Sequence, residues 1–200
     1  DKYVKFLKQK QIPFVAVGKF PDDDVVQVDH DNVGACKELV TVLFAKGIQN
    51  IAYLGSNMDQ MVNRCRYQGY EEAYRKGKRK LNQDLVYTDL SSRAMVEKAV
   101  EELKNSGVEC ILCQDDYICD EVVRKLARMG VRIPDQMKVA SCHYSRILEN
   151  YPITITSLKF NITELGRRSC QVLLDMIHGK TVPDKTLLDY EIILKESTKG

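Results

Sequence analysis

Four short polar segments of this sequence each come after an apolar run of the length of a β-strand. Their side chains include an arginine, two adjacent aspartates and a histidine. A guanidinium donates several hydrogen bonds and a carboxylate accepts them, so this combination suits the hydroxyl groups of a neutral polyol. We therefore expect a ligand-binding site built from Gly18-Lys19-Phe20, Asn63-Arg64-Cys65-Arg66, Gln114-Asp115-Asp116 and Cys142-His143-Tyr144.

Asp115 and Asp116 have a structural interpretation as well as a functional one. They stand between an apolar run and a helical pattern. A carboxylate in that place accepts hydrogen bonds from the N–H groups of the first helical turn, where negative charge is also favourable. We expect one of the two aspartates to cap the helix and at least one of them to contact a ligand.

The same residues do not form a catalytic pattern. Cys142 and His143 are adjacent, and adjacent side chains on a strand point to opposite faces, which disfavours a nucleophile–base pair. Asp115 and Asp116 are also neighbours rather than a facing pair. The sequence has no GxSxG, glycine-rich phosphate loop or HExxH motif. We predict a binding protein rather than an enzyme, with no cofactor.

The seven cysteines are an odd number, so at least one thiol stays unpaired. Most of them lie in apolar runs, where a thiol behaves as a small hydrophobic side chain. Cys110 and Cys113 have the CxxC spacing of a zinc site, but no second CxxC and no HxxxH accompanies them. We predict core packing rather than a metal site, and a reducing, cytoplasmic location.

Charge is nearly balanced, with 30 Lys and Arg against 28 Asp and Glu. A domain that binds nucleic acid by itself usually has a clustered basic excess, which neutralises phosphates. The basic run at 76–80 follows a helical pattern and is interpreted as a solvated helix end. No apolar run approaches the roughly 20 residues of a membrane span, and the N-terminus is not a signal peptide. We expect these residues to contact neither DNA nor a membrane.

The polar segments need a scaffold, and the spacing of apolar residues predicts one. Short apolar runs alternate with helical patterns along most of the chain. The predicted strands are 14–17, 51–54, 85–87, 110–113 and 139–141, and the predicted helices lie within 33–44, 67–74, 95–103 and 118–129. This alternation predicts an α/β fold with a doubly wound parallel sheet covered on both faces. In such a sheet, ligands gather at the carboxyl ends of the strands.

The two ends of the chain have patterns of their own. Residues 153–158 are extended and β-branched, 162–178 follow a helical pattern, and 187–194 are predicted as a final strand. Val4, Phe6 and Leu7 have the spacing of a buried helix face right at the start. We therefore expect the chain to begin inside a domain.

Six segments resemble, in order and spacing, the motifs of LacI/GalR-type bacterial transcription regulators. They are VDHDNVGA at 28–35 (similar to VDNDNxxA), KGIQNIAYLG at 46–55 (GHxxIAxIxG), RYQGY at 66–70 (RxxGY/F), CQDDYIC at 113–119 (xxNDxxAxG), GVRIPD at 130–135 (GxxIPxD), and ITSL at 155–158 with ELG at 164–166 (LTTVxQxxxxxG). The six together span nearly the whole chain, which makes the resemblance specific. Residues 12–19 look most like the maltose-type branch.

The resemblance implies a type I periplasmic-binding-protein-like fold of two doubly wound parallel-sheet lobes, with an effector held between them. It also implies that the helix-turn-helix headpiece and the first βα units of an incomplete N-terminal lobe are absent. Residues 1–28 and 159–182 would form the partial N-terminal lobe, and 29–158 with 183–200 the C-terminal lobe. The hinge would lie near Asp29, Leu158 and Pro183.

The resemblance also implies roles for particular residues. Arg66 corresponds to the family arginine that holds effector hydroxyls. Asp115 stands where many members have an effector-binding Asn, and Asp116 matches the Asp beside it. His143 replaces an effector-contacting Asp, which removes a carboxylate acceptor, and Phe160 stands where an often polar cleft residue is found. The predicted effector site is Gly18, Arg66, Asp115, Asp116, His143 and Phe160.

The function implied is that of an effector-sensing and dimerisation domain. A small sugar-like ligand would favour one arrangement of the lobes and so change how the headpieces of a homodimer bind operator DNA. Two alternatives remain open: a periplasmic sugar-binding protein of a transporter, and a regulator that responds to a protein partner. The odd, apolar-embedded cysteines count against the first, and His143 in place of an aspartate favours the second.

Overall fold

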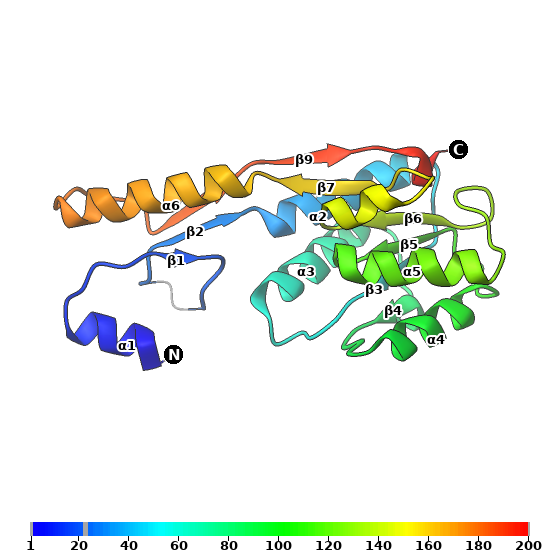
Figure 1. Cartoon of the computed structure of the whole chain (residues 1–200), viewed down its shortest axis with the longest axis horizontal. Helices are drawn as coiled ribbons and strands as arrows, with labels where there is room; N and C mark the ends of the chain where they lie inside the picture. Colours follow the sequence, from blue (N-terminus) through cyan, green and yellow to red (C-terminus); the bar gives the residue numbers. More distant parts are fainter. Residues whose placement is uncertain (1, 22–23, 200) are drawn as a thin grey trace. The chain divides into compact units, whose positions relative to one another are not determined.

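The computed structural model describes residues 2–21 and 24–199. The chain divides into two compact units. Unit 1 comprises Asp1–Asp31 and Asn161–Tyr190, and unit 2 comprises Asn32–Phe160 and Glu191–Gly200. Each unit contains a sheet with parallel strand pairs and at least one helix, which confirms the predicted α/β class (Figure 1). Among the described residues, no helix has the length and apolar character that a membrane span requires.

Unit 2 is built on a six-stranded sheet with the order β4-β3-β5-β6-β7-β9. Its strands are β3 (Ile51–Leu54), β4 (Val86–Tyr87), β5 (Cys110–Cys113), β6 (Lys138–Ser141), β7 (Thr156–Phe160) and β9 (Tyr190–Ile193). The pairs from β4 to β7 are all parallel. Every residue of β3 and β5 is buried, which explains why these strands are continuous apolar runs rather than alternating ones.

Helices cover both faces of this sheet. They are α2 (Asn32–Ala45), α3 (Met61–Lys76), α4 (Arg93–Leu103) and α5 (Asp116–Arg128). Ala52 and Leu54 of β3 pack into one core with side chains of α4 and α5. Tyr53 lies between them in sequence, and its ring centroid is 5.2 Å from that of Tyr70 on α3. The alternation follows from the two-residue period of a strand, so β3 packs against α4 and α5 on one face and against α3 on the other.

The chain reverses its direction of winding at β3. It leaves β3 through α3 to β4 on one side and then returns through α4 to β5 on the other side. The carboxyl ends of β3 and β5 therefore meet at a topological switch point, where doubly wound sheets bind ligands. This position is where the sequence predicted the polar segments to converge.

The helices of unit 2 begin at residues that can cap them. The Ser92 side chain accepts a hydrogen bond from the backbone N–H of Met95 at the start of α4, and the Asp115 side chain does the same for Ile118 at the start of α5. Each cap satisfies one of the N–H groups that have no partner within the helix. The position of α5 is thus defined by a residue of the predicted site.

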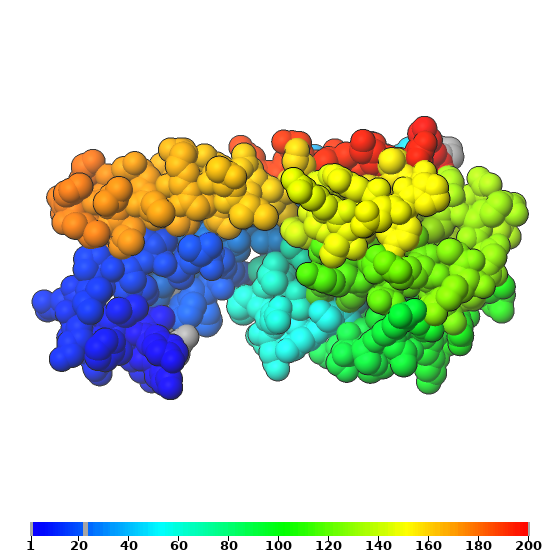
Figure 2. All heavy atoms as spheres, viewed as in Figure 1, coloured from blue at the N-terminus to red at the C-terminus, as the bar shows by residue number. Residues whose placement is uncertain are grey.

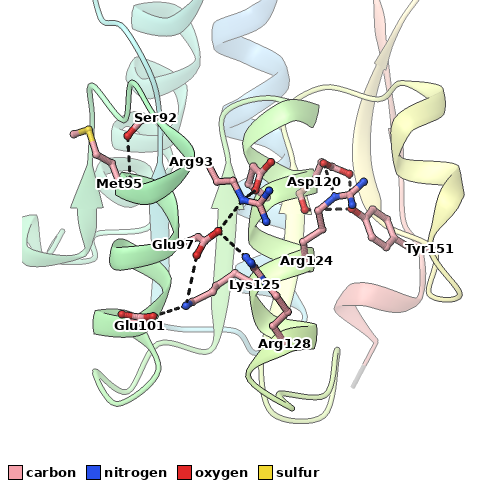
Figure 3. Close-up of polar contacts among 11 residues, drawn as sticks. Ser92, Arg93, Met95, Glu97, Glu101, Asp120, Arg124, Lys125, Arg128 and Tyr151 are labelled. Atoms are coloured by element: carbon pink, nitrogen blue, oxygen red, sulfur yellow. Dashed lines mark hydrogen bonds and ion pairs between the residues drawn. The ribbon is translucent and has the colours of Figure 1, made fainter.

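A network of charged side chains connects α4 to α5 (Figure 3). Glu97 of α4 lies 2.8 Å from Arg93 on its own helix and 2.7 Å from Arg128 on α5. Lys125 of α5 lies near both Glu97 and Glu101. Hydrogen bonds from Arg128 and Arg93 lower the pKa of Glu97 to about 2. The carboxylate stays ionised at ordinary pH, which keeps the two helices in register at the surface.

Unit 1 is smaller and has a three-stranded parallel sheet. Its elements are α1 (Lys2–Gln9), β1 (Ala16–Val17), β2 (Gln27–His30), α6 (Ile162–Ile177) and β8 (Lys185–Leu188), and its strand order is β1-β2-β8. Most of α6, orange in Figure 2, lies at the surface, and only Ser169 and Val172 are buried. The Asn161 side chain caps this helix by accepting from the N–H of Glu164.

The structure corrects several predicted elements. The predicted strand 14–17 shortens to β1, and β2 was not predicted because its sequence, QVDH, has no apolar run. In α1 only Val4 is buried, whereas Phe6 is 53% exposed. The predicted final strand 187–194 is two strands, β8 and β9, which belong to different sheets.

The unit boundaries also differ from the predicted lobes. The units change after Asp31, Phe160 and Tyr190, two to seven residues beyond the predicted crossovers at Asp29, Leu158 and Pro183. The largest difference concerns the prediction that 183–200 belong with 29–158. Lys185–Leu188 instead pairs with β2, because backbone hydrogen bonds rather than apolar pattern decide which sheet receives a strand.

The contact between α2 and α3 depends on a residue without a side chain. A Cβ atom at Gly69 would lie 2.4 Å from the carbonyl oxygen of Val33 and 2.9 Å from the Cβ of Cys36. We expect Gly69→Ala to lower the free energy of unfolding by about 1–3 kcal/mol, because the helices must separate. Chemical denaturation of purified variants measures this.

Gly166 provides the matched control, because it is also helical and a Cβ there meets no atom within 4 Å. Gly166→Ala should be neutral or stabilising by up to about 1 kcal/mol, since alanine is the better helix former. Equal losses in the two variants would show that close packing is not what requires glycine at position 69.

Candidate functional site

Arg66 connects the two strands of the switch point. It lies on α3, which follows β3, and is only 8% exposed. Its Nη1 donates a hydrogen bond to the backbone carbonyl of Gln114, directly after β5, at 3.0 Å. Its Nε donates to Oδ1 of Asn32, the first residue of α2, at 3.4 Å. Arg66 thus joins three elements of unit 2 at the carboxyl ends of its strands.

The charge of Arg66 is not neutralised by these contacts. Both hydrogen-bond acceptors are neutral oxygen atoms, and its guanidinium carbon lies 6.0 Å from the centre of the Phe160 ring. Among the described residues, none accepts a hydrogen bond from its second terminal nitrogen, Nη2. A nearly buried cation without a counter-charge is costly, so a ligand with acceptor oxygens would be stabilised here.

Gln114 holds the loop after β3 in place. Its side chain is fully buried, accepts a hydrogen bond from the N–H of Ser56 at 3.0 Å and donates to the Ser56 hydroxyl at 3.1 Å. A Cβ at Gly55 would lie 2.6 Å from Oε1 of Gln114, which explains the glycine there. The sequence analysis placed Gln114 in one of the polar segments after a strand, but it did not include Gln114 among the predicted effector-site residues.

The two aspartates have different partners, and the prediction that one of them caps the helix is confirmed. Asp115 caps α5 through its hydrogen bond from Ile118 at 2.9 Å. Asp116 is 5% exposed, and its Oδ1 lies 3.0 Å from Nδ1 of His143. Burial raises the pKa of Asp116, but hydrogen bonds from Ser145 and His143 outweigh it and the pKa is lowered. An ionised carboxylate can only accept, so Nδ1 of His143 is the donor in this pair.

His143 and Phe160 form the remaining part of the site. Their rings are stacked, with centroids 6.3 Å apart and planes 17° apart. Phe160 thus contacts His143 as well as Arg66. The structure brings together four of the predicted residues, named here the Arg66 cluster: Arg66, Asp116, His143 and Phe160. Binding of an effector by this cluster stays a prediction.

The other two predicted site residues do not join these contacts. Asp115 is adjacent to Asp116, but it uses its side chain to cap α5. Gly18 belongs to unit 1, directly after β1, and has the left-handed φ of +96° that favours glycine. This φ is itself a structural reason for the glycine, and the backbone N–H of Gly18 donates to the carbonyl of Val28 at 2.9 Å. Its role in binding remains a prediction.

The cysteines pack as predicted. Six of the seven are buried and only Cys170 is exposed, and none forms a disulfide within the described residues. The sulfur atoms of Cys36 and Cys142 lie 3.6 Å apart, next to the Arg66 cluster. Burial raises the pKa of Cys36 well above its usual range, so the reactive thiolate is disfavoured. A search of the described part of the chain finds no cluster of ligands that could hold a metal ion.

A cavity of about 600 Å³ lies away from the Arg66 cluster. It is lined mainly by apolar side chains, including Val123, Ile133 and Ile153, with Tyr151 among them. The Tyr151 hydroxyl donates to the backbone carbonyl of Asp120 on α5 at 3.2 Å. None of the cavity's lining residues belongs to the predicted site.

A family profile described as the periplasmic binding protein-like domain matches residues 40–198 of the chain. The match covers most of the sequence, including α3, α5 and the strands that carry the Arg66 cluster. The chain belongs to this family. The fold predicted from the resemblance is therefore confirmed.

Characterised relatives of this periplasmic binding protein-like domain are bacterial regulators. The chain is 26% identical over 203 residues to the HTH-type transcriptional regulator CelR of Thermobifida fusca, with 98% of the chain and 60% of that protein covered. It is 26% identical over 204 residues, with the same coverage, to the HTH-type transcriptional regulator MalR of Streptococcus pneumoniae. The chain therefore spans about 60% of the length of these relatives.

A solved structure of a transcriptional regulator is also similar to this chain. The CelR–cellobiose complex is 25% identical and superposes with a TM-score of 0.86, with 98% of the chain and 62% of that protein covered. The resemblance to LacI/GalR regulators, predicted from six motifs, is confirmed by these relatives. The maltose-type branch stays a prediction, because the CelR and MalR relatives are equally similar to this chain.

The buried Asp116 carboxylate has a pH-dependent contribution to stability. The pKa of Asp116 is lower in the folded state than in the unfolded chain, where it is about 3.9. The ionised carboxylate therefore stabilises the fold fully above the unfolded-state pKa, and this stabilisation is lost as the pH falls through the folded-state pKa. We expect Asp116→Asn to cost about 1–3 kcal/mol at neutral pH, and the difference from wild type to shrink below about pH 4. Denaturation curves across this pH range measure it.

Asp115→Asn is the control for the neighbouring position, because asparagine caps helices as well as aspartate does. It should change stability by a few tenths of a kcal/mol at most. A constant difference between Asp116→Asn and wild type at every pH would contradict the proposed ionised state of Asp116.

Proposed function

We propose that this chain is the effector-sensing part of a LacI/GalR-type transcription regulator and that it binds a small sugar-like molecule. The observation that carries the proposal is the nearly buried Arg66, whose described partners are neutral and whose Nη2 has no acceptor. A guanidinium fixed at the switch point of a doubly wound sheet is placed to hold ligand oxygens. The stacked Phe160 offers an apolar surface beside it.

The relatives support this proposal over its alternatives. They are HTH-type transcriptional regulators, and one is described in complex with cellobiose. This favours a regulator over a periplasmic transport protein. It also favours a small-molecule effector over a protein partner, which His143 in place of an aspartate had kept open. The same relatives support a binding role rather than an enzymatic one.

The partners of the whole protein belong to the same proposal. Operator DNA would be bound by a helix-turn-helix headpiece, and a homodimer would match the two-fold symmetry of operators. The protein would act as a repressor in the cytoplasm. A ligand changes DNA affinity only by its different affinities for two conformations of the regulator, so effector and operator would each weaken or strengthen binding of the other by the same factor.

Sugar binding is tested by thermal denaturation of the full-length protein with cellobiose, maltose, glucose and galactose. A ligand that binds only the native state stabilises it by about 2.7 kcal/mol at about a hundredfold excess over Kd. We expect one sugar class to raise the melting temperature and Arg66→Ala to abolish the rise. The same sugar should change operator affinity of the wild-type protein.

Arg64→Ala is the matched control, because Arg64 lies on the same helix but its side chain is about half exposed and contacts Asp59 and Met58. It should keep the sugar response. A sugar response that survives Arg66→Ala, in protein that melts as a folded domain, would contradict the role proposed for Arg66.

A further inference from the structure

Gln114 contacts both ends of the segment 56–66. Its side-chain amide accepts from the backbone N–H of Ser56 at 3.0 Å and donates from Nε2 to the Ser56 hydroxyl at 3.1 Å. Its backbone carbonyl accepts from Nη1 of Arg66 at 3.0 Å. The segment between these contacts contains the loop after β3 and the first part of α3. One residue directly after β5 therefore holds the segment at its beginning and at the guanidinium of Arg66.

The start of α3 has no side-chain cap of its own. Gln60 stands at the N-cap position, and its side chain makes no capping hydrogen bond. The helices α4 and α5, by contrast, each begin at a residue whose side chain caps them. In α3 the side chain of Asn63 donates to the backbone carbonyl of Asn57 at 2.7 Å, which joins the first turn of the helix to the loop before it. The position of α3 thus depends on this loop, to which Gln114 makes two hydrogen bonds.

The Gln114 side chain has one well-defined place. It is fully buried, and its Oε1 lies 3.5 Å from the Tyr53 hydroxyl as well as 3.0 Å from the backbone nitrogen of Ser56. The glycine at position 55 leaves room for Oε1, since a Cβ there would lie 2.6 Å from it. A buried amide without partners would be desolvated and uncompensated, so the folded state favours the arrangement in which the Ser56 contacts are made.

We propose that Gln114 is a positioning residue of the effector site, which holds the loop after β3 and the start of α3 so that Arg66 keeps one orientation toward the ligand. The inference rests on the proposed function, because it requires a ligand that Arg66 binds. The side chain of Gln114 acts through Arg66 and not on the ligand. It raises the fraction of molecules in which Arg66 is in the binding arrangement, and the apparent affinity is proportional to that fraction.

The binding test uses the full-length protein and whichever sugar raises its melting temperature. Gln114→Met keeps the side chain long and unbranched but removes the amide donor and acceptor. Binding must then also order the segment 56–66, which costs conformational entropy. We expect the Kd measured by isothermal titration calorimetry to increase about tenfold or more, as a lower fraction of binding-competent molecules requires.

Thr156→Val is the matched control for loss of stability. Thr156 is also fully buried in unit 2, but its hydroxyl contacts the Thr198 hydroxyl and the backbone carbonyl of Lys195 rather than the Arg66 cluster. This variant should lower the melting temperature because a buried hydrogen bond is lost. It should leave the Kd of the folded protein unchanged, so the comparison separates weaker binding from weaker folding.

Hydrogen exchange of the ligand-free protein measures the same contacts without a sugar. In Gln114→Met, the backbone amides of the loop after β3 and of the first turns of α3 should exchange faster than in wild type. The amides of α4, which packs on the other face of β3, should keep their wild-type rates. Exchange that rises equally in both regions would show general destabilisation and overturn the positioning role.

The outcomes separate this inference from the proposed function. A wild-type Kd in Gln114→Met, with binding still abolished by Arg66→Ala, would overturn the inference and leave the sensor function standing. Absence of sugar binding by the wild-type protein would overturn the proposed sugar effector together with the role of Gln114 in its binding.

Discussion

A single guanidinium group joins the parts of unit 2 from which the site is made. Arg66 reaches from α3 to the carbonyl that follows β5 and to the first residue of α2, so it spans the place where the sheet reverses its winding. Arg66 is only 8% exposed, so its charge is almost removed from water. Because no described side chain neutralises it, the folded domain keeps a buried positive charge whose natural complement is a ligand.

The remaining residues of the site are arranged around this constraint. Asp116 does not balance the charge of Arg66, because its carboxylate accepts hydrogen bonds from Ser145 and His143. That hydrogen bond positions the imidazole, and Phe160 then contacts both His143 and Arg66. The choice of Asp115 rather than Asp116 as helix cap is therefore consequential, since it leaves Asp116 available to orient His143.

The sheet and helices of unit 2 position these side chains. The central strands β3 and β5 are buried throughout, Gln114 follows β5 directly, and Phe160 is the last residue of β7. Gln114 fixes the Ser56 loop, and Gly69 lets α3 approach α2 closely enough for Arg66 to reach Asn32. Packing of this kind positions polar groups before a ligand arrives, which lowers the entropic cost of binding.

Much of this protein was determined by its sequence alone. The alternation of apolar runs and helical patterns specified the α/β class, because a strand buried on both faces must be apolar throughout. Six motifs in register identified the family, and the positions after strands pointed to Arg66, Asp116 and His143 as neighbours. These features depend on local composition and order along the chain, which a single sequence records.

Other features were decided only by the tertiary structure. The polar strand β2 and the division of 187–194 between two sheets depend on which backbone groups meet across distant segments. The sequence could not say which aspartate caps α5, nor that His143 would hold the other one. The neutral hydrogen-bond partners of Arg66 follow from three-dimensional contacts among residues far apart in the chain. Such contacts depend on distance and burial, which the order of residues does not contain.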